Sequence, residues 1–321
     1  RLVASGGTVL AFGAQGLSGE TFAIDAATGE ERWRGSFSVF RGSSAAFLDG
    51  RGFVYDQTGG HLLTGFDLAM GRTLWTERLE TSGLGARPAA DAGVVCITGY
   101  ARTGEYGLYG YDAATGRQRW RYLSNDLAQT RAVPAGGTCF FGTSQGFVYA
   151  VDVATGNARW QKRTGAGVMT DPMPAGDVLA VLTADGSLLG LDAATGRERW
   201  RNELGDDAAT DAREGLAAGI AGGVLFVDGL NGALFAVDPA TGRLRWKKAG
   251  SGPGSRPTGS AGERDSSFPV VSGGLALVAG EDRISALDLA TGAARWEREV
   301  ARGRGQQPLI SGSLVYHSAG R

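Results

Sequence analysis

Short apolar runs recur along the chain, and each is followed by a polar turn sequence. The runs LYGY, FVYAV and LFAV end directly before Asp112, Asp152 and Asp238. Runs of this length and composition are typical of half-buried β-strands. The Asp favours a turn because its carboxylate can bond backbone groups two residues on, and a glycine four residues later supplies positive φ at little steric cost. The pattern predicts repeated β-hairpins.

An Asp and a Trp are eight positions apart in seven copies of this hairpin, without insertion or deletion. The copies use every tryptophan of the chain: Trp33, Trp75, Trp120, Trp160, Trp200, Trp246 and Trp296. The period of about 44 residues suits one four-stranded unit per repeat. Alternation along the second strand places each Trp on one face and its charged neighbours on the other, so the Trp is available for packing.

The last complete repeat predicts four strands, at 268–272, 275–279, 284–289 and 293–300. Residues 307–318 then resemble the first two strands of one more unit. Seven complete units and a partial one predict an eight-bladed ring, with seven blades and a trailing hairpin as the alternative. We expect one domain over residues 1–321, in a fragment truncated at both ends.

The repeat resembles the tryptophan-docking motif of the quinoprotein-like β-propellers, named after the pyrroloquinoline quinone (PQQ) dehydrogenases. Its pattern Ala-x-Asp-x-x-Thr-Gly-x-x-x-Trp is matched from Ala150, Ala236 and Ala286 onward. The resemblance implies an all-β propeller of four-stranded antiparallel blades, in which each tryptophan packs between its own blade and the next. One copy has Met70 in place of Thr and Leu74 in place of Arg, which predicts a looser turn there.

An arginine precedes the tryptophan in six of the seven copies. We expect these arginines to solubilise the outer edges and to pair with neighbouring blades, rather than to form a basic binding ring. They are Arg32, Arg119, Arg159, Arg199, Arg245 and Arg295.

Composition narrows the possible partners. A net charge of −1 implies no general attraction to nucleic acid or to an anionic membrane. The chain contains no run of 18 apolar residues, so we expect no membrane insertion of this segment. Glycine is abundant, at 54 of 321 residues, which fits frequent tight turns because the apolar fraction stays at 42%.

Cys96 and Cys139 are the only cysteines, and each lies in an apolar strand sequence. We expect both to fall at the same register of neighbouring repeats. Equivalent strands of adjacent blades diverge from the axis, so we expect two buried free thiols and no disulfide.

The chain lacks the cofactor-site residues of the quinoprotein dehydrogenases after which the family is named. Those enzymes have an adjacent pair of cysteines against the cofactor, a tryptophan floor, and calcium ligands from Glu, Asn and Asp. Here the cysteines are 43 positions apart and every tryptophan belongs to a hairpin. We therefore expect no catalytic residue, no cofactor and no metal.

Few other residues of the sequence suggest catalysis or metal binding. His61 and His317, the only histidines, fall in separate repeats and are expected at strand ends on the surface. An acidic connector contains Asp206, Asp207 and Asp211, which are oxygen donors of the kind that cations prefer. It lacks the alternation of a calcium-binding loop, so solvated charge is the expectation.

The position directly before each inner strand varies more than the hairpins do. It should lie near the mouth of the central channel, on the face of the loops that link one blade to the next. Two interpretations stay open: a clamp for a carboxylate or a peptide backbone, or an internal salt-bridge network. The candidate residues are Arg87, Arg131, Asp171, Phe268 and Gln307.

Taken together, these features predict a non-enzymatic binding or scaffold domain. The resemblance implies two contexts, the sensor region of an actinobacterial membrane Ser/Thr kinase and the lipoprotein scaffold of outer-membrane β-barrel assembly. A PQQ-dependent oxidoreductase is a third, disfavoured alternative. The expected partner is a protein, peptide or small molecule at the channel mouth. The expected location is extracytoplasmic, at the cell surface or in the periplasm, with an anchor supplied by a segment outside this sequence.

Overall fold

The structure is a computed structural model in which every element is a β-strand in the residues that it describes. It divides into two compact units, Arg1–Gln161 and Lys162–Arg321. The described residues are 2–5, 7–12, 20–35, 37, 45–56, 60–79, 81–82, 87–101, 104–124, 126–128, 130–204, 218–228, 233–249, 269–279, 283–299, 309–311 and 314–316.

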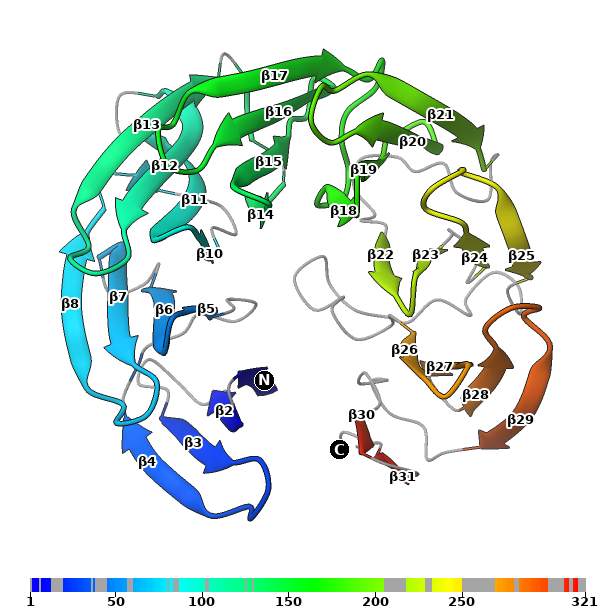
Figure 1. The fold of residues 1–321 in the computed structure, drawn as a ribbon, viewed down its shortest axis with the longest axis horizontal. Coiled ribbons are helices and arrows are strands. Elements are labelled where there is room, and N and C mark those ends of the chain that lie inside the picture. The colour runs from blue at the N-terminus through cyan, green and yellow to red at the C-terminus, as the bar shows by residue number, and fades with distance from the viewer. Residues whose placement is uncertain are drawn as a thin grey trace. The chain divides into compact units, whose positions relative to one another are not determined.

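The first unit contains blades 1 to 4, antiparallel sheets whose strands pair in chain order. Figure 1 labels these strands except β1 and β9. Blade 1 is β1 (Leu2–Ser5), β2 (Thr8–Phe12), β3 (Thr21–Asp25) and β4 (Glu31–Gly35). Blade 2 is β5 (Ala46–Leu48), β6 (Arg51–Asp56), β7 (Leu62–Asp67) and β8 (Thr73–Arg78). Blade 3 is β10 (Ala89–Asp91), β11 (Val94–Ala101), β12 (Tyr106–Asp112) and β13 (Gln118–Ser124), with β9 (Thr81–Ser82) added beside β11. Blade 4 is β14 (Val133–Ala135), β15 (Thr138–Gly142), β16 (Phe147–Asp152) and β17 (Ala158–Arg163).

The second unit contains blades 5 to 7 and a two-stranded sheet. Blade 5 is β18 (Met173–Ala175), β19 (Val178–Leu182), β20 (Ser187–Asp192) and β21 (Glu198–Glu203). Blade 6 is β22 (Ala218–Ala221), β23 (Val224–Asp228), β24 (Leu234–Val237) and β25 (Leu244–Lys248). Blade 7 is β26 (Val270–Ser272), β27 (Leu275–Ala279), β28 (Arg283–Asp288) and β29 (Ala294–Glu299). The last sheet is β30 (Leu309–Ser311) with β31 (Leu314–Tyr316).

The predicted all-β organisation in four-stranded antiparallel blades is therefore confirmed. Seven complete blades and one partial sheet are present in the described residues, as the repeats predicted. In blade 7 the second strand has the predicted bounds, and the other three differ by one or two residues. The single domain over residues 1–321 stays a prediction.

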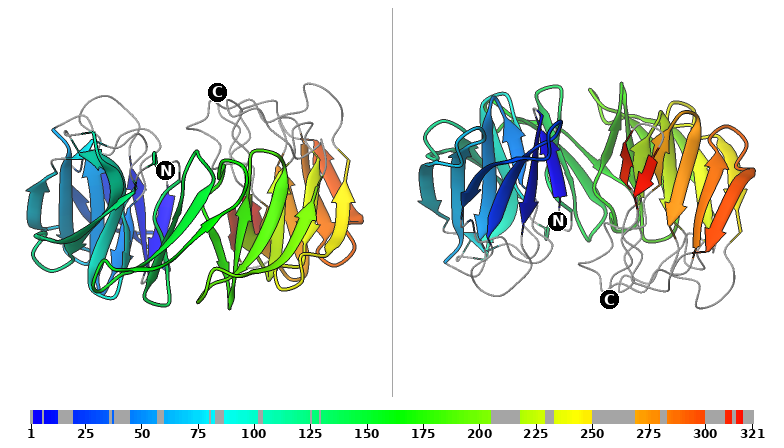
Figure 2. Two further views of the ribbon diagram at one scale, coloured as in Figure 1. Left: turned by 90° about the horizontal axis from the view of Figure 1, so that it is seen from above. Right: turned by 90° about the horizontal axis from the view of Figure 1, so that it is seen from below.

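The first strands of neighbouring blades lie side by side on the inner side of the first unit. Inner strand β10 contacts both β5 and β14, whereas outer strand β8 is exposed along most of its length (Figure 1). The strands of each unit run between two edges, where the connecting turns gather (Figure 2). Each blade therefore presents one strand inward, one outward, and two between them.

A middle strand is buried on both faces where its blade packs between two others of the same unit. In β6, Phe53 and Tyr55 join the hydrophobic cluster between blades 2 and 3, whereas Val54 joins the cluster between blades 1 and 2. Similar clusters lie between blades 3 and 4, 5 and 6, and 6 and 7. The half-buried strands expected from the sequence are thus fully buried at the centre of a blade.

The cysteines do not share a register, contrary to the prediction. Cys96 of β11 pairs with Gly110, whereas Cys139 of β15 pairs with Val151. Counted from the strand starts, Cys139 occupies the place of Val95, one residue before the place of Cys96. A shift of one residue turns a side chain to the other face of a sheet. Both thiols therefore face the layer between blades 3 and 4.

Candidate functional site

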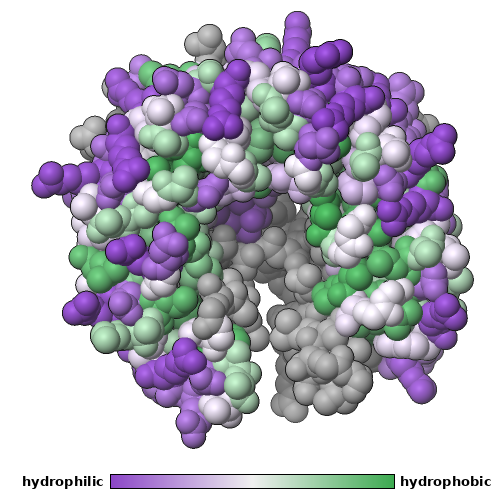
Figure 3. Space-filling model, in the orientation of Figure 1, coloured by the Kyte–Doolittle hydropathy of each residue, from purple (hydrophilic) through white to green (hydrophobic). Residues whose placement is uncertain are grey.

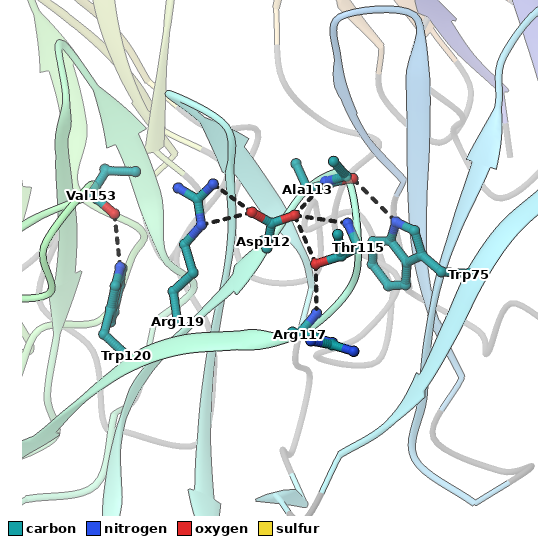
Figure 4. Close-up of polar contacts among 9 residues, drawn as sticks. Trp75, Asp112, Ala113, Thr115, Arg117, Arg119, Trp120 and Val153 are labelled. Atoms are coloured by element: carbon teal, nitrogen blue, oxygen red, sulfur yellow. Dashed lines mark hydrogen bonds and ion pairs between the residues drawn. The ribbon is translucent and has the colours of Figure 1, made fainter.

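The repeated turn is held by its aspartate. The Asp112 Oδ1 atom accepts hydrogen bonds from the backbone N–H groups of Ala114 at 3.0 Å and Thr115 at 2.8 Å, and from the Thr115 hydroxyl at 2.9 Å (Figure 4). The Gly116 N–H donates to the Asp112 carbonyl at 2.8 Å, with Gly116 at a φ of 76°. This geometry explains the spacing, since only glycine adopts such a φ without strain.

The second carboxylate oxygen of the aspartate binds the arginine that precedes the tryptophan. Arg119 Nε donates to Asp112 Oδ2 at 2.9 Å, and the ion pair holds the pKa of Asp112 at about 2. The same pairing occurs in all six copies that have the arginine. The prediction that these arginines pair with neighbouring blades is wrong, because each one lies within reach of the Asp of its own hairpin.

A β-bulge directs the arginine toward the aspartate. Gly110 is opposite Trp120, but the next pair is Tyr111 with Gln118, so Arg119 is the extra residue of β13. The register shifts at the same place in blades 1, 2, 5, 6 and 7. A bulge re-aims one side chain while pairing continues on both sides.

Each described tryptophan that contacts a following blade does so through the turn of that blade. Trp75 Nε1 donates to the Ala113 carbonyl at 3.1 Å, and Trp120 Nε1 donates to the Val153 carbonyl at 2.9 Å (Figure 4). Trp33 and Trp246 make the corresponding bonds. A Cβ added to Gly116 would lie 2.5 Å from the Trp75 ring, so the ring and the turn are in close contact.

The tryptophan also covers a small residue of its own blade. In every described pair, the residue opposite Trp on the third strand is glycine or alanine. A Cβ on Gly110 would lie 2.2 Å from the Trp120 ring. The first position of the repeated motif is therefore small because the indole ring lies against it.

The turn of blade 2 is not looser, contrary to the prediction. Asp67 Oδ1 accepts the N–H groups of Ala69 and Met70 at 2.9 Å, and the Gly71 N–H donates to the Asp67 carbonyl at 2.8 Å. Substitution of Thr by Met70 and of Arg by Leu74 removes only side-chain partners of the Asp. The backbone bonds preserve the turn.

The contact between blades 5 and 6 departs from the pattern. In other hairpins, the residue after the Asp donates its N–H to the turn before the second strand, as Ala113 does to Gly93 at 3.0 Å. Pro239 has no N–H to donate. Trp200 Nε1 is buried and has no acceptor in the described structure, although Asn202 Nδ2 reaches the Gly242 carbonyl at 2.8 Å.

We expect Pro239→Ala to raise the free energy of unfolding by about 1 kcal/mol. The change restores the backbone N–H donor at position 239 and allows Trp200 Nε1 to donate to the carbonyl of the same residue. The greater flexibility of the unfolded chain offsets part of this gain. Urea unfolding of the two proteins measures the difference. Asp238 and Thr241 keep their bonds in either case, so a lower stability of the variant would contradict the explanation.

Stability should fall as the hairpin aspartates are protonated. Their pKa values are lowered by the arginines, so their contribution is present above the unfolded value of about 4 and is lost as the pH falls through the folded value. That folded value is about 2 for Asp112, Asp152, Asp192 and Asp288. We expect the melting temperature to drop between about pH 4 and pH 2. Arg119→Met should melt lower than the parent protein at pH 7 and converge with it at pH 2.

The predicted mouth residues are placed in part. Arg87 and Arg131 belong to the first unit and precede the adjacent inner strands β10 and β14, where Arg87 is buried and Arg131 half-buried. Asp171 precedes β18 in the second unit and is half-buried. Phe268 and Gln307 lie outside the described residues.

The connection from blade 3 to blade 4 is anchored beside Arg131. The Thr98 hydroxyl of blade 3 donates to the Thr130 carbonyl at 3.1 Å, and the Thr143 hydroxyl donates to Asp126 Oδ2 at 2.7 Å. Thr143 lies in the turn between the second and third strands, so the connector and this turn share one edge of the blade. Arg131 therefore follows directly after a connector held by hydrogen bonds.

A family model described as outer membrane protein assembly factor BamB matches residues 17–164 and 123–321. The chain belongs to this family. Membership of the PQQ-like repeat propellers, predicted from the hairpin motif, is thereby confirmed. Among curated proteins, none matches the chain.

Solved structures support the same fold for this BamB-family chain. BamB from Moraxella catarrhalis has a TM-score of 0.72 and 17% identity, covering 99% of this chain and 90% of that one. A europium-containing methanol dehydrogenase has a TM-score of 0.69 and 13% identity, covering 96% and 79%. The designed protein Ika8 has 0.67 and 15%, covering 99% and 92%. These identities establish a β-propeller and leave activity open.

The described residues of the BamB-family chain do not fit a quinone with calcium. Cys96 and Cys139 are fully buried between blades 3 and 4, and the tryptophans lie in the outer hairpins. No group of three His, Cys, Asp or Glu side chains that could hold a metal ion occurs in the described part. His61 Nδ1 lies 2.9 Å from the Tyr55 hydroxyl, which engages that ring.

The surface of the described residues mixes hydrophilic and hydrophobic side chains. Hydrophilic side chains gather at the periphery of each unit, with hydrophobic ones between them over the blades (Figure 3). Within the described residues, no helix is long and apolar enough to cross a membrane. The acidic connector residues Asp206, Asp207 and Asp211, and His317, lie outside the described part.

Proposed function

We propose that this chain is a non-catalytic propeller scaffold that binds a protein partner outside the cytoplasm. The proposal rests on one observation: the repeated polar residues form hydrogen bonds and ion pairs within the fold. The Asp of each hairpin binds its own turn, and six of the seven also bind an arginine, while the tryptophans bridge blades. The repeated chemistry is thus structural, and the family match to an assembly factor favours protein binding.

The partner surface is proposed at the inner edge, where successive blades differ. Arg87 and Arg131 occupy equivalent places before adjacent strands β10 and β14, so both belong to one region of the first unit. The proposal rests on these two residues, since Asp171 belongs to the second unit and Phe268 and Gln307 lie outside the described residues. Arginine suits such a role because its planar donors match a carboxylate or successive peptide carbonyls.

Two biological contexts fit a propeller of this kind. The first is a ligand- or protein-binding sensor module of a bacterial membrane Ser/Thr kinase, and the second is a scaffold for outer-membrane protein assembly, which the family description favours. The sequence upstream of this segment in the full gene distinguishes them. A kinase domain with a membrane helix supports the sensor, and a lipid-attachment cysteine supports the scaffold.

The binding surface is tested by photo-cross-linking in cells that express the full-length protein. A photoreactive residue in place of Arg131 should yield a discrete adduct, whereas the same residue in place of Arg121, an exposed residue of outer strand β13, should not. With the purified partner, Arg131→Ala should weaken binding by about 1–3 kcal/mol. Arg121 is a cleaner control than Arg199, which binds Asp177 and Asp192.

Two results would contradict the proposal. Adducts at position 121 with none at position 131 would move the interface to the outer rim. Saturable binding of pyrroloquinoline quinone with calcium, together with dye reduction by alcohols or sugars, would show the oxidoreductase alternative instead.

A further inference from the structure

The two cysteines meet in the hydrophobic layer between blades 3 and 4. Cys96 comes from β11 and Cys139 from β15, and both are 0% exposed. They share a cluster with Leu108, Phe141 and Val151. Burial first, and then the neighbouring Cys96 thiol, raise the pKa of the Cys139 thiol, and both side chains belong to the same buried layer. Neither thiol has a role in the docking hairpins or at the proposed partner surface.

The one-residue offset between Cys96 in β11 and Cys139 in β15 places both side chains in the layer between blades 3 and 4. If Cys139 stood in the place of Phe140, it would face away from blade 3, because side chains alternate along a strand. In its actual place it faces blade 3, in the cluster that also contains Cys96. Facing sheets of a β-sandwich are spaced closely enough for an inter-sheet disulfide, as immunoglobulin domains show.

We propose that Cys96 and Cys139 form a disulfide between blades 3 and 4 under oxidising conditions. Each thiol loses its proton, a bond forms between the two Sγ atoms, and two electrons pass to a disulfide oxidant such as oxidised glutathione. The oxidant is reduced to two thiols, so atoms and electrons balance. In cells the bond depends on the extracytoplasmic location proposed above, because cytosolic thiols are kept reduced.

Burial determines when the bond can form. It raises the pKa of the Cys139 thiol, and exchange needs a thiolate that the oxidant can reach. The reaction therefore occurs during folding, or when the layer opens, and not on the closed protein. Once formed, the bond is shielded from reductants in the same way.

The cross-link would reinforce contacts that already join the blades. Asp91 Oδ2 of blade 3 accepts the Gly137 N–H at 3.1 Å, and Trp120 holds the Val153 carbonyl on the outer side. A bond between residues 43 positions apart restricts the unfolded chain considerably. It would fix the interface beside Arg131, the central residue of the proposed partner surface.

Refolding tests the proposal directly. The protein is unfolded in guanidinium, refolded with a mixture of reduced and oxidised glutathione, and alkylated under denaturing conditions. We expect a mass 2 Da below that of the dithiol, no alkyl groups, and one non-reduced peptide pair containing Cys96 and Cys139. The melting temperature should rise by about 5 °C relative to protein refolded with reductant. Cys96→Ala should melt equally with and without oxidant.

Opposite results would overturn the proposal. These are two alkyl groups on every molecule, glutathione bound to either cysteine, or disulfide-linked dimers in place of the internal bond. The location is judged separately. Free thiols in protein isolated from cells, with a complete cross-link after refolding, would contradict the extracytoplasmic proposal and leave the disulfide intact.

Discussion

Replacing Trp246 with alanine is expected to lower the free energy of unfolding by about 3–5 kcal/mol, the range for large-to-small changes in a core. Trp246 is 8% exposed, lies in the cluster between blades 6 and 7, and donates to the Leu289 carbonyl at 3.0 Å. Its ring centroid is 6.0 Å from that of Phe226. The substitution removes this packing and leaves a carbonyl without its donor.

The chain offers a matched control. Trp296 has the same place in the next hairpin and is opposite Ala286, as Trp246 is opposite Ala236, but it is 37% exposed. Trp296→Ala should therefore cost only about 1–2 kcal/mol. Urea unfolding of both variants measures the two values. Equal costs would show that contact with a following blade contributes little, contrary to the structure.

The repeated hairpin could be predicted because its residues act locally. Asp112, Thr115 and Gly116 bond to one another within five positions, so their spacing is fixed by the turn itself. The small residue two positions before the Asp was visible as well, and its reason appears only in the structure, where the Trp120 ring covers Gly110. The hairpin could be predicted from the sequence because its hydrogen bonds join residues that are close in the chain.

The partner of Arg119 was missed because alternation along a strand ignores bulges. Strict alternation puts the arginine and the tryptophan on opposite faces, which suggests a partner on another blade. The extra residue in β13 instead returns Arg119 to Asp112, seven positions earlier. Six repetitions of an Asp and an Arg at this spacing were an available signal, since a pair kept at one interval suggests a contact.

The register of the cysteines was predicted wrongly because the two strands were aligned by their apolar residues. Counting from the turn glycine gives the observed offset of one residue, since Cys96 is three residues after Gly93 and Cys139 is two after Gly137. Counting back from the Asp fails, because the turns between the second and third strands differ in length. The partner surface is less predictable still, since the burial of Arg87, which is 8% exposed, is not encoded by any local pattern.

The glycine of the hairpin provides the sharpest test of how blades dock. Gly116→Ala is expected to lower the free energy of unfolding by about 2–4 kcal/mol, through a left-handed φ and a clash of the new Cβ with Trp75.

Gly29 separates these two causes, because it has the same place in blade 1 and a φ of 75°, with no atom of the described structure within 4 Å of an added Cβ. Gly29→Ala should therefore cost only the backbone strain, about 1–2 kcal/mol. Urea unfolding of both variants gives the two values. If the two variants were equally destabilised, the indole would not be pressed against the following turn, and the blades would be held together by their hydrophobic layers alone.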